Sequence, residues 1–200
     1  MAAQLVVGSL LFAILASSSG HQSAIPDFRR EDENVLRLVL DRLIFPELAK
    51  FGRRTPAPIL LVEDQTTPLD ATGKIPDRWQ KFLKADPKNG WPGLIADDER
   101  RQHVIDSFES RNVRSYQLPD LGRSDLMRVE SGQIAEMRQQ YSDRLIGVVR
   151  FSLPGYSMDG YAMILVSYGC GDLCGASWLM ILDNTTGSWR IANGFPLSVS

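Results

Sequence analysis

The chain contains only two cysteines, Cys170 and Cys174, and they lie between two almost wholly apolar runs of residues. The runs cover residues 161–168 and 176–182, and glycines flank the cysteine pair. Two short apolar runs joined by a glycine-rich loop predict an antiparallel hairpin. A hairpin brings the ends of its loop within the α-carbon spacing of a disulfide. We therefore expect a Cys170–Cys174 disulfide, which for so short a loop stabilises the fold by only about 2 kcal/mol.

Two other chemistries remain open for this cysteine pair. A redox-active pair usually has the spacing C-x-x-C at a helix N-terminus, whereas the spacing here is C-x-x-x-C and the following run resembles a strand. A buried helix of a thioredoxin-like unit is the alternative for that run. Copper carriers use C-x-x-x-C with a distant histidine, but the chain has only His21 and His103. A zinc site would need further Cys or His residues.

The N-terminal segment, residues 1–20, contains no Asp, Glu, Lys or Arg and has an apolar core from Leu5 to Ala16. Small residues follow this core, a pattern typical of a cleaved signal peptide. Cleavage is expected between residues 18 and 24. The core is shorter than the roughly 20 residues that span a bilayer, so no transmembrane segment is expected after cleavage. The alternative is a buried N-terminal helix, because no Lys or Arg precedes the core. We expect a secreted or periplasmic protein.

The rest of the chain, residues 21–200, predicts a single domain that is long enough to bury a substantial core. Helices are expected at 35–45, from Pro76, at 97–111 and at 132–141, and strands at 58–62 and 112–118. Four strand-like runs then follow one another, at 145–151, 161–168, 176–182 and 188–191. Consecutive short strands joined by tight turns favour an antiparallel meander. We therefore expect an α+β fold in which several helices pack on a C-terminal antiparallel β-meander.

Two of the predicted helices have a clear apolar face. Residues at the helical spacing form these faces: Leu36, Val39, Leu40 and Leu43 in the first helix, and Val104, Ile105 and Phe108 in the helix over 97–111. Pro46 should end or kink the first helix, because proline cannot donate the backbone hydrogen bond that continues it. Asp97 can cap the other helix at its N-terminus.

Charge and composition restrict the partners of this protein. The chain has 22 Lys and Arg residues against 24 Asp and Glu residues, a formal net charge of −2. A nucleic-acid-binding surface would be basic, so nucleic acid is not an expected partner. The sequence contains neither a glycine-rich phosphate loop nor the spacing of a calcium-binding loop, so no cofactor or metal is expected. A protein or a small molecule is the expected kind of ligand.

No set of residues predicts a catalytic site. The segment 155–160 resembles the G-x-S-x-G nucleophile motif, but its second glycine comes one residue late and a turn is expected. His103 lies on a predicted helix rich in charged residues, where a surface position is expected. Asp159, Asp172 and Asp183 occupy predicted turns, where Asp is common for backbone reasons. The first and last of these should share one end of the sheet, and two facing carboxylates would suit glycoside hydrolysis.

Two tryptophans and one asparagine are further candidates for a binding or modification site. Trp178 and Trp189 lie in adjacent predicted strands, and aromatic residues in a meander usually pack the sheet. An exposed set of aromatic side chains would instead mark a ligand or partner face. Asn184 begins an N-glycosylation sequon in a predicted turn, which would be modified only in a eukaryotic secretory pathway.

The C-terminal part of the chain follows a definite order of motifs. An aromatic-Ser stretch, an Asp-Gly turn, an aliphatic strand, Cys-Gly-x-x-Cys-Gly, a second aliphatic strand and Gly-x-Trp-x-Ile occur at 151–152, 157–160, 163–166, 170–175, 179–182 and 187–191. This order resembles that of small exported bacterial proteins of unassigned role. The resemblance implies an exported domain that ends in a cysteine-clipped β-hairpin, and it implies no activity and no catalytic residues.

Export and fold signals without a matching catalytic set favour a non-catalytic binding or envelope-associated protein of unknown ligand. One alternative is a secreted hydrolase whose carboxylates or Ser and His side chains assemble only in three dimensions. A second alternative is a thiol-redox or copper-handling protein that uses Cys170 and Cys174.

Overall fold

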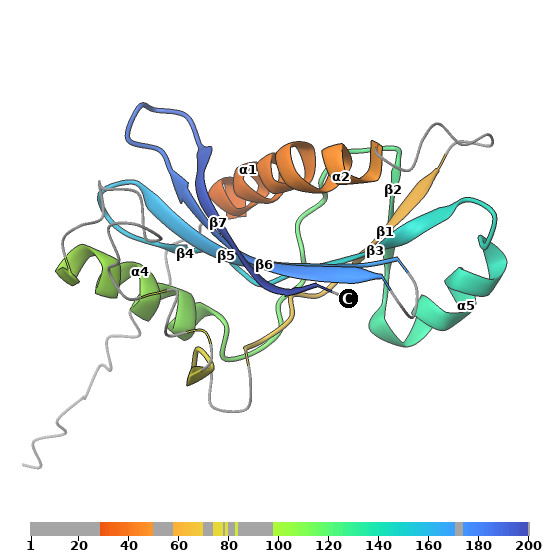
Figure 1. Ribbon diagram of the computed structural model, residues 1–200, viewed down its shortest axis with the longest axis horizontal. Coiled ribbons are helices and arrows are strands. Elements are labelled where there is room, and N and C mark those ends of the chain that lie inside the picture. Colours follow the sequence, from red (N-terminus) through yellow and green to blue (C-terminus); the bar gives the residue numbers. More distant parts are fainter. Residues whose placement is uncertain are drawn as a thin grey trace, which may run out of the picture.

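The computed structural model describes residues 29–49, 58–69, 74–77, 79, 83, 98–170 and 174–199. The predicted signal peptide, Asp97 and Asp172 lie outside these residues. A mixed sheet with the strand order β2-β1-β3-β5-β6-β7 forms the centre of the molecule, and the short strand β4 pairs with β5 (Figure 1). The strands are β1 (Ile59–Glu63), β2 (Leu126–Val129), β3 (Leu145–Phe151), β4 (Gly155–Tyr156), β5 (Tyr161–Gly169), β6 (Gly175–Asp183) and β7 (Arg190–Val199).

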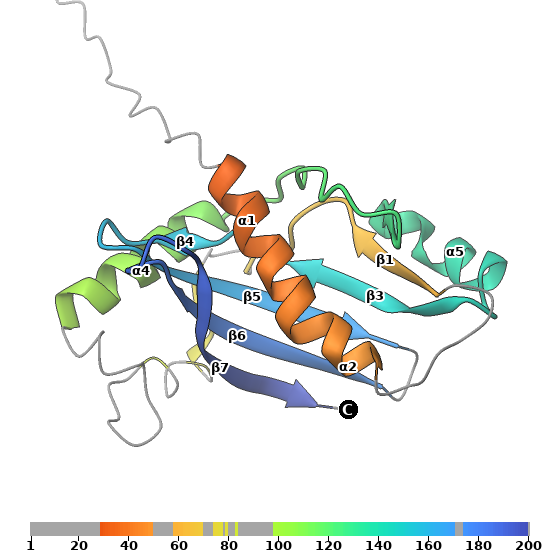
Figure 2. The same cartoon turned by 90° about the horizontal axis from the view of Figure 1, so that it is seen from above.

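The helices lie on both sides of this sheet (Figures 1 and 2). They are α1 (Arg29–Val39), which continues through a π-helical segment (Leu40–Ile44) into α2 (Phe45–Ala49), then α4 (Asp98–Arg111), and α5 (Ile134–Gln140), which follows a 3-10 turn (Ser131–Gln133). Helices α1 and α2 cross one face of the sheet, and α4 lies on the opposite side (Figure 1). The fold is therefore α+β.

The expected arrangement of helices on a C-terminal meander is wrong. Strands β3, β5, β6 and β7 do pair antiparallel in chain order, but the sheet continues beyond β3. There β1 pairs parallel with β3 on one side and with β2 on the other. Every residue of β1 is buried, which suits a strand with neighbours at both edges and covered faces. Parallel strands also need long connections, and the segments that carry α4 and α5 provide them.

The strand predicted over 112–118 does not form. Within that segment Gln117 makes an isolated antiparallel bridge, to Gln65, and the strand that pairs with β1 at the edge away from β3 is β2. β2 has one mainly buried residue, Val129, so its sequence shows little of the alternation that identifies a strand. Its pairing depends on β1, which is distant in the chain.

Helical periodicity correctly predicts the buried faces of α1 and α4. The residues Val35, Leu36, Val39, Leu40 and Ile44 pack on one face of the sheet, in a cluster with residues of β1, β3 and β5. On the other side, Val104, Ile105 and Phe108 of α4 pack against β5 and β6. A smaller cluster joins Ile134 of α5 to β1 and β3. Pro46 does not end the first helix, because it lies in the first turn of α2, where its missing N–H is tolerated.

Candidate functional site

A polar groove lies where the parallel strands β1, β2 and β3 end. Its volume is about 630 Å³, and residues from four separate segments line it: Glu63, Asp64, Gln65, Thr66, Thr67 and Pro68, then Ser115 and Gln117, then Glu130, Ser131 and Gly132, and finally Arg150. The register pairs Glu63 with Val129 and Val62 with Val149, so the three strand ends are level with one another. Sites at the carboxyl ends of parallel strands are common in sheets that contain them.

An ion pair between neighbouring strands belongs to the wall of the groove. Arg150 Nε lies 2.6 Å from Glu63 Oε2, and the exposed fractions of the two side chains are 37% and 9%. Glu63 lines the groove, so its carboxylate can accept a hydrogen bond from a molecule bound there.

Backbone pairing holds one wall of the groove in place. Leu118 N–H donates to the Asp64 carbonyl at 2.8 Å, and Thr66 N–H donates to the Tyr116 carbonyl at the same distance. The Thr66 hydroxyl in turn accepts from Tyr116 N–H at 2.9 Å. The side chain of Gln117 donates to Asp64 Oδ2 at 3.3 Å. These bonds join segments about 50 residues apart, so the groove is part of the folded framework.

The side chains that line the groove carry more negative than positive charge. Three carboxylates line it, on Glu63, Asp64 and Glu130, against the single guanidinium of Arg150. Arg150 compensates Glu63, with which it pairs, and the other two carboxylates remain uncompensated by the lining residues. The remaining polar lining consists of hydroxyl and amide groups. The groove can therefore accept hydrogen bonds from a ligand at many points and favours positive charge.

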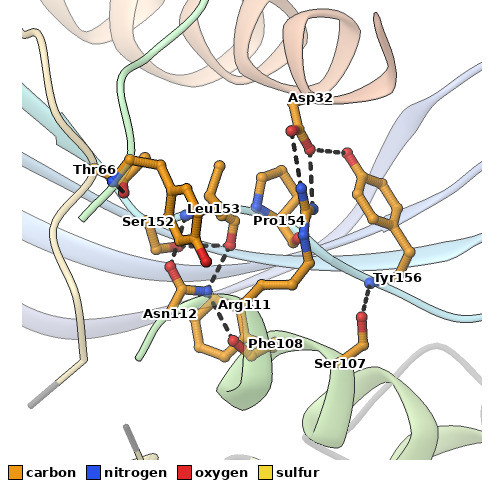
Figure 3. A network of polar contacts seen from close by, with 11 residues as sticks. Asp32, Thr66, Ser107, Phe108, Arg111, Asn112, Ser152, Leu153, Pro154 and Tyr156 are labelled. Carbon is orange, nitrogen blue, oxygen red and sulfur yellow. Dashed lines mark hydrogen bonds and ion pairs between the residues drawn. The ribbon is translucent and has the colours of Figure 1, made fainter. Parts of the chain in front are cut away.

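A second polar cluster, at the contact of α1, α4 and β4, is buried and has its hydrogen bonds satisfied (Figure 3). Arg111 donates to both carboxylate oxygens of Asp32, at 3.0 and 2.9 Å, and also to the Pro154 carbonyl. The Tyr156 hydroxyl donates to Asp32 at 2.9 Å, and Tyr156 N–H donates to Ser107 Oγ. Burial and the neighbouring Asp32 carboxylate raise the pKa of Tyr156 far above its ordinary value, so the phenol stays protonated.

Asn112 extends this network toward the sheet (Figure 3). Its amide donates to the carbonyls of Phe108 and Leu153 at 2.8 and 2.9 Å, and its oxygen accepts from Leu153 N–H at 2.7 Å. The side chain is fully buried, and these bonds use both of its ends. The cluster therefore fastens α4 to the connection between β3 and β4, and its contacts are those of a structural network.

The cysteine pair lies at the tip of the β5–β6 hairpin, as the sequence predicts. Cys170 and Cys174 form a disulfide with α-carbons 5.2 Å apart, and Cys170 N–H donates to the Cys174 carbonyl at 3.0 Å. Cys170 also packs against the apolar cluster beneath α1. No group of three or more His, Cys, Asp or Glu side chains within the described ranges is arranged to hold a metal ion.

The structure does not bring the candidate catalytic residues together in a pocket. His103 is exposed on α4. Asp159 is exposed and lies 3.3 Å from Arg100 Nε, whereas Asp183 is buried and pairs with Arg190. Burial alone would raise the pKa of Asp183, but its hydrogen bonds with Arg190 and Thr185 outweigh burial and lower the pKa. Asp159 and Asp183 share one end of the sheet, as predicted, but each is engaged by an arginine.

The candidate aromatic side chains mostly pack within the fold. Trp178 is partly buried against the apolar cluster beneath α1. Trp189 contacts the Tyr156 ring at a centroid distance of 5.7 Å and donates through Nε1 to Glu31 at 2.6 Å. Within the described part of the chain, the large apolar side chains that are exposed are Val113 and Met158. Asn184 lies in the β6–β7 turn with its side chain partly buried.

The groove is the feature that sequence analysis missed. The one signal for it is the run of polar residues after the buried strand β1, from Glu63 to Thr67. The same run is equally typical of a turn-rich loop without a binding site. The opposite walls come from segments that show no relation to it in the sequence.

Comparisons with known proteins found no matching protein family, no matching curated protein and no matching solved structure. No described helix combines the length and apolar character that crossing a membrane requires.

Proposed function

We propose that this chain is an exported, non-catalytic binding protein that holds a small polar ligand in the groove at the ends of β1, β2 and β3. The groove itself, with the ion pair of Glu63 and Arg150 in its wall, is the observation that carries this proposal. Binding sites are typically concave and contain a few well-placed polar groups. This groove has the volume of a small-molecule site, and its polar groups are held by backbone pairing.

The arrangement of the other candidates favours binding over hydrolysis. A hydrolase of the kind considered above needs two facing carboxylates, or a nucleophile within reach of a base. Asp159 and Asp183 each pair with an arginine, and His103 lies exposed on α4. These positions support a protein that binds its ligand and leaves it chemically unchanged. The signal-like leader and the cysteine pair support export, since disulfides persist in oxidising compartments.

Blocking the groove tests the proposed function. At Gly132, which lines the groove, an added β-carbon would have no heavy atom within 4 Å, so Gly132→Trp can fill the groove without displacing the fold. We expect at least one of three probes, butane-1,4-diol, glutarate or butane-1,4-diamine, to shift the backbone amide signals of Ser115, Gln117 and Gly132 saturably. We expect Gly132→Trp to weaken that response, followed at Ser115 and Gln117, at least tenfold, as measured by NMR titration of the exported protein.

Gly169→Trp is the matched control for this experiment. Gly169 also has open space around its added β-carbon, but it lies at the end of β5 and does not line the groove. The control should respond to the probes as the unaltered protein does. If none of the three probes shifts the groove amides, or if both tryptophan variants respond equally, the proposed function is wrong.

The disulfide between Cys170 and Cys174 is expected to hold its own hairpin loop in place, and to add little to the stability of the rest of the fold. Replacing both residues in Cys170→Ser/Cys174→Ser should lower the free energy of unfolding by about 2 kcal/mol, because the closed loop is short. Urea denaturation of the unaltered protein with and without dithiothreitol should give the same difference, and the double variant should be insensitive to the reductant. A double variant that is unfolded at room temperature would contradict this small effect. A disulfide that is reduced as readily as that of a thiol–disulfide exchange catalyst would favour the thiol-redox alternative.

A further inference from the structure

We infer that Met158 is a reversible oxidation site, at which a peroxide converts the thioether to a sulfoxide while the fold stays intact. Met158 lies in the turn that joins β4 to β5, and its side chain is fully exposed. It does not line the groove at the ends of β1, β2 and β3, so this assignment is independent of the proposed binding function.

The other residues of this turn hold its shape. Ser157 N–H donates to the Tyr161 carbonyl at 2.9 Å, and Tyr161 N–H donates to Ser157 Oγ at 3.0 Å. The Gly160 carbonyl accepts from Asn184 N–H, in the neighbouring β6–β7 turn, at 2.7 Å. The side chain of Met158 takes no part in these contacts and is exposed along its whole length. The turn therefore presents the thioether to solvent, and the fold does not depend on it.

The other methionines of the described residues are less accessible. Met163 of β5 and Met180 of β6 are 0% and 3% exposed, and Met127 and Met137 pack partly buried in the cluster that contains Ile134. Oxidation makes methionine polar, so a sulfoxide in the core would need a hydrogen-bond donor that apolar neighbours do not supply. Water supplies that donor at Met158. Exposure thus separates one harmless site of oxidation from sites where oxidation would disrupt the core.

The chemistry at Met158 is a two-electron oxidation of the sulfur. Hydrogen peroxide transfers one oxygen atom to Sδ, its O–O bond breaks and water leaves, so the sulfur is oxidised and the peroxide is reduced. Methionine sulfoxide reductases reverse the change with two thiols, which form a disulfide while the sulfoxide oxygen leaves as water. Full exposure gives such an enzyme access to the sulfur of Met158.

Peroxide treatment of the exported protein, followed by peptide mapping with mass spectrometry, measures the oxidation rate of each methionine. We expect Met158 to gain an oxygen atom at least tenfold faster than Met163 and Met180. In concentrated urea the three rates should agree within threefold, because unfolding exposes all three side chains. If Met163 or Met180 is oxidised in the folded protein as fast as Met158, or if the difference persists in urea, the assignment is wrong.

The oxidised protein tests whether the fold stays intact. Protein oxidised at Met158 should have the same midpoint of urea denaturation as the untreated protein. Met158→Leu is the matched control, since leucine has a similar size and no sulfur, and it should also keep that midpoint. A lower midpoint after oxidation would contradict the inference, because Met158 would then contribute to the packing of the fold.

Reversal is measured on the same oxidised protein. Methionine sulfoxide reductases A and B, which act on the two sulfoxide epimers, should remove the oxygen from Met158 in the folded chain when dithiothreitol is present. The loss is read from the mass of the peptide that contains Met158, so reduction of the cysteine pair does not interfere. A sulfoxide that these enzymes remove only after unfolding in urea would overturn the assignment of a reversible site.

Discussion

The variant Gly155→Ala is expected to be strongly destabilised. Gly155 is buried in β4, where the strand lies directly against α4. A β-carbon at this position would come within 2.3 Å of the backbone nitrogen and α-carbon of Phe108, and within 2.4 Å of its β-carbon. The nitrogen and the α-carbon are backbone atoms of α4, so a side-chain rotation cannot relieve the clash. Overpacking in a core costs about 1–3 kcal/mol, and we expect about 3 kcal/mol or more here.

Urea denaturation followed by circular dichroism measures this loss as a lower midpoint. Gly132→Ala is the matched control, because its added methyl group meets no heavy atom within 4 Å. The control should keep the stability of the unaltered protein or raise it by up to about 1 kcal/mol, since alanine lowers the entropy of the unfolded chain. If Gly155→Ala unfolds at the same urea concentration as the control, the close packing of α4 on β4 is wrong.

The variant Arg111→Met is expected to destabilise the fold by about 3–5 kcal/mol. The exposed fractions of the Arg111 and Asp32 side chains are 12% and 7%, and the pair makes two parallel hydrogen bonds. Removing the guanidinium leaves a buried carboxylate whose remaining hydrogen bond comes from the Tyr156 hydroxyl. It also removes the donor to the Pro154 carbonyl. The penalty is that of an uncompensated buried charge, which greatly exceeds the value of an exposed pair.

Two comparisons isolate this effect. Arg37→Met breaks an exposed ion pair, in which Arg37 lies 2.5 Å from Glu33, and should cost less than about 1 kcal/mol. The double variant Arg111→Met/Asp32→Leu removes both charges and should recover part of the stability that Arg111→Met loses, because no carboxylate is left unpaired. The free energy of unfolding of the double variant could instead fall below that of Arg111→Met by as much as a second large core substitution costs. In that case the unpaired buried carboxylate of Asp32 is the wrong explanation for the loss in Arg111→Met.

Both predictions concern contacts between residues that are far apart in the chain. Arg111 lies on a helix that the sequence predicts, whereas Asp32 lies three residues before the predicted start of the other helix. In the sequence, each is one of many charged residues typical of a surface. Gly155 reads as part of a turn, because glycine after proline is typical of turns. Neither residue carries a local sign of its partner. The close approach of α4 to β4, and the ion pair beside it, therefore appear only when the fold is assembled.

The groove also depends on contacts between residues that are far apart in the chain. Glu63 and Arg150 are 87 positions apart, and they meet because β1 inserts between β2 and β3 in parallel. The sequence predicts β1 as a buried strand from its aliphatic run, yet gives no indication of its neighbours. An apolar run suits a central strand of any sheet. The expected meander consequently lacked β1 and β2, and with them the strand ends that form the groove.

The sequence by itself determined what depends on neighbours along the chain. Helical spacing identified the buried faces of α1 and α4, apolar runs identified β3, β5 and β6, and the glycine-flanked cysteines identified the hairpin loop. The tertiary structure alone decided the parallel insertion of β1, the Asp32–Arg111 pair and the groove. Local periodicity records which side of an element is apolar, whereas strand order and buried charge pairs depend on contacts across long stretches of chain, which no periodicity records.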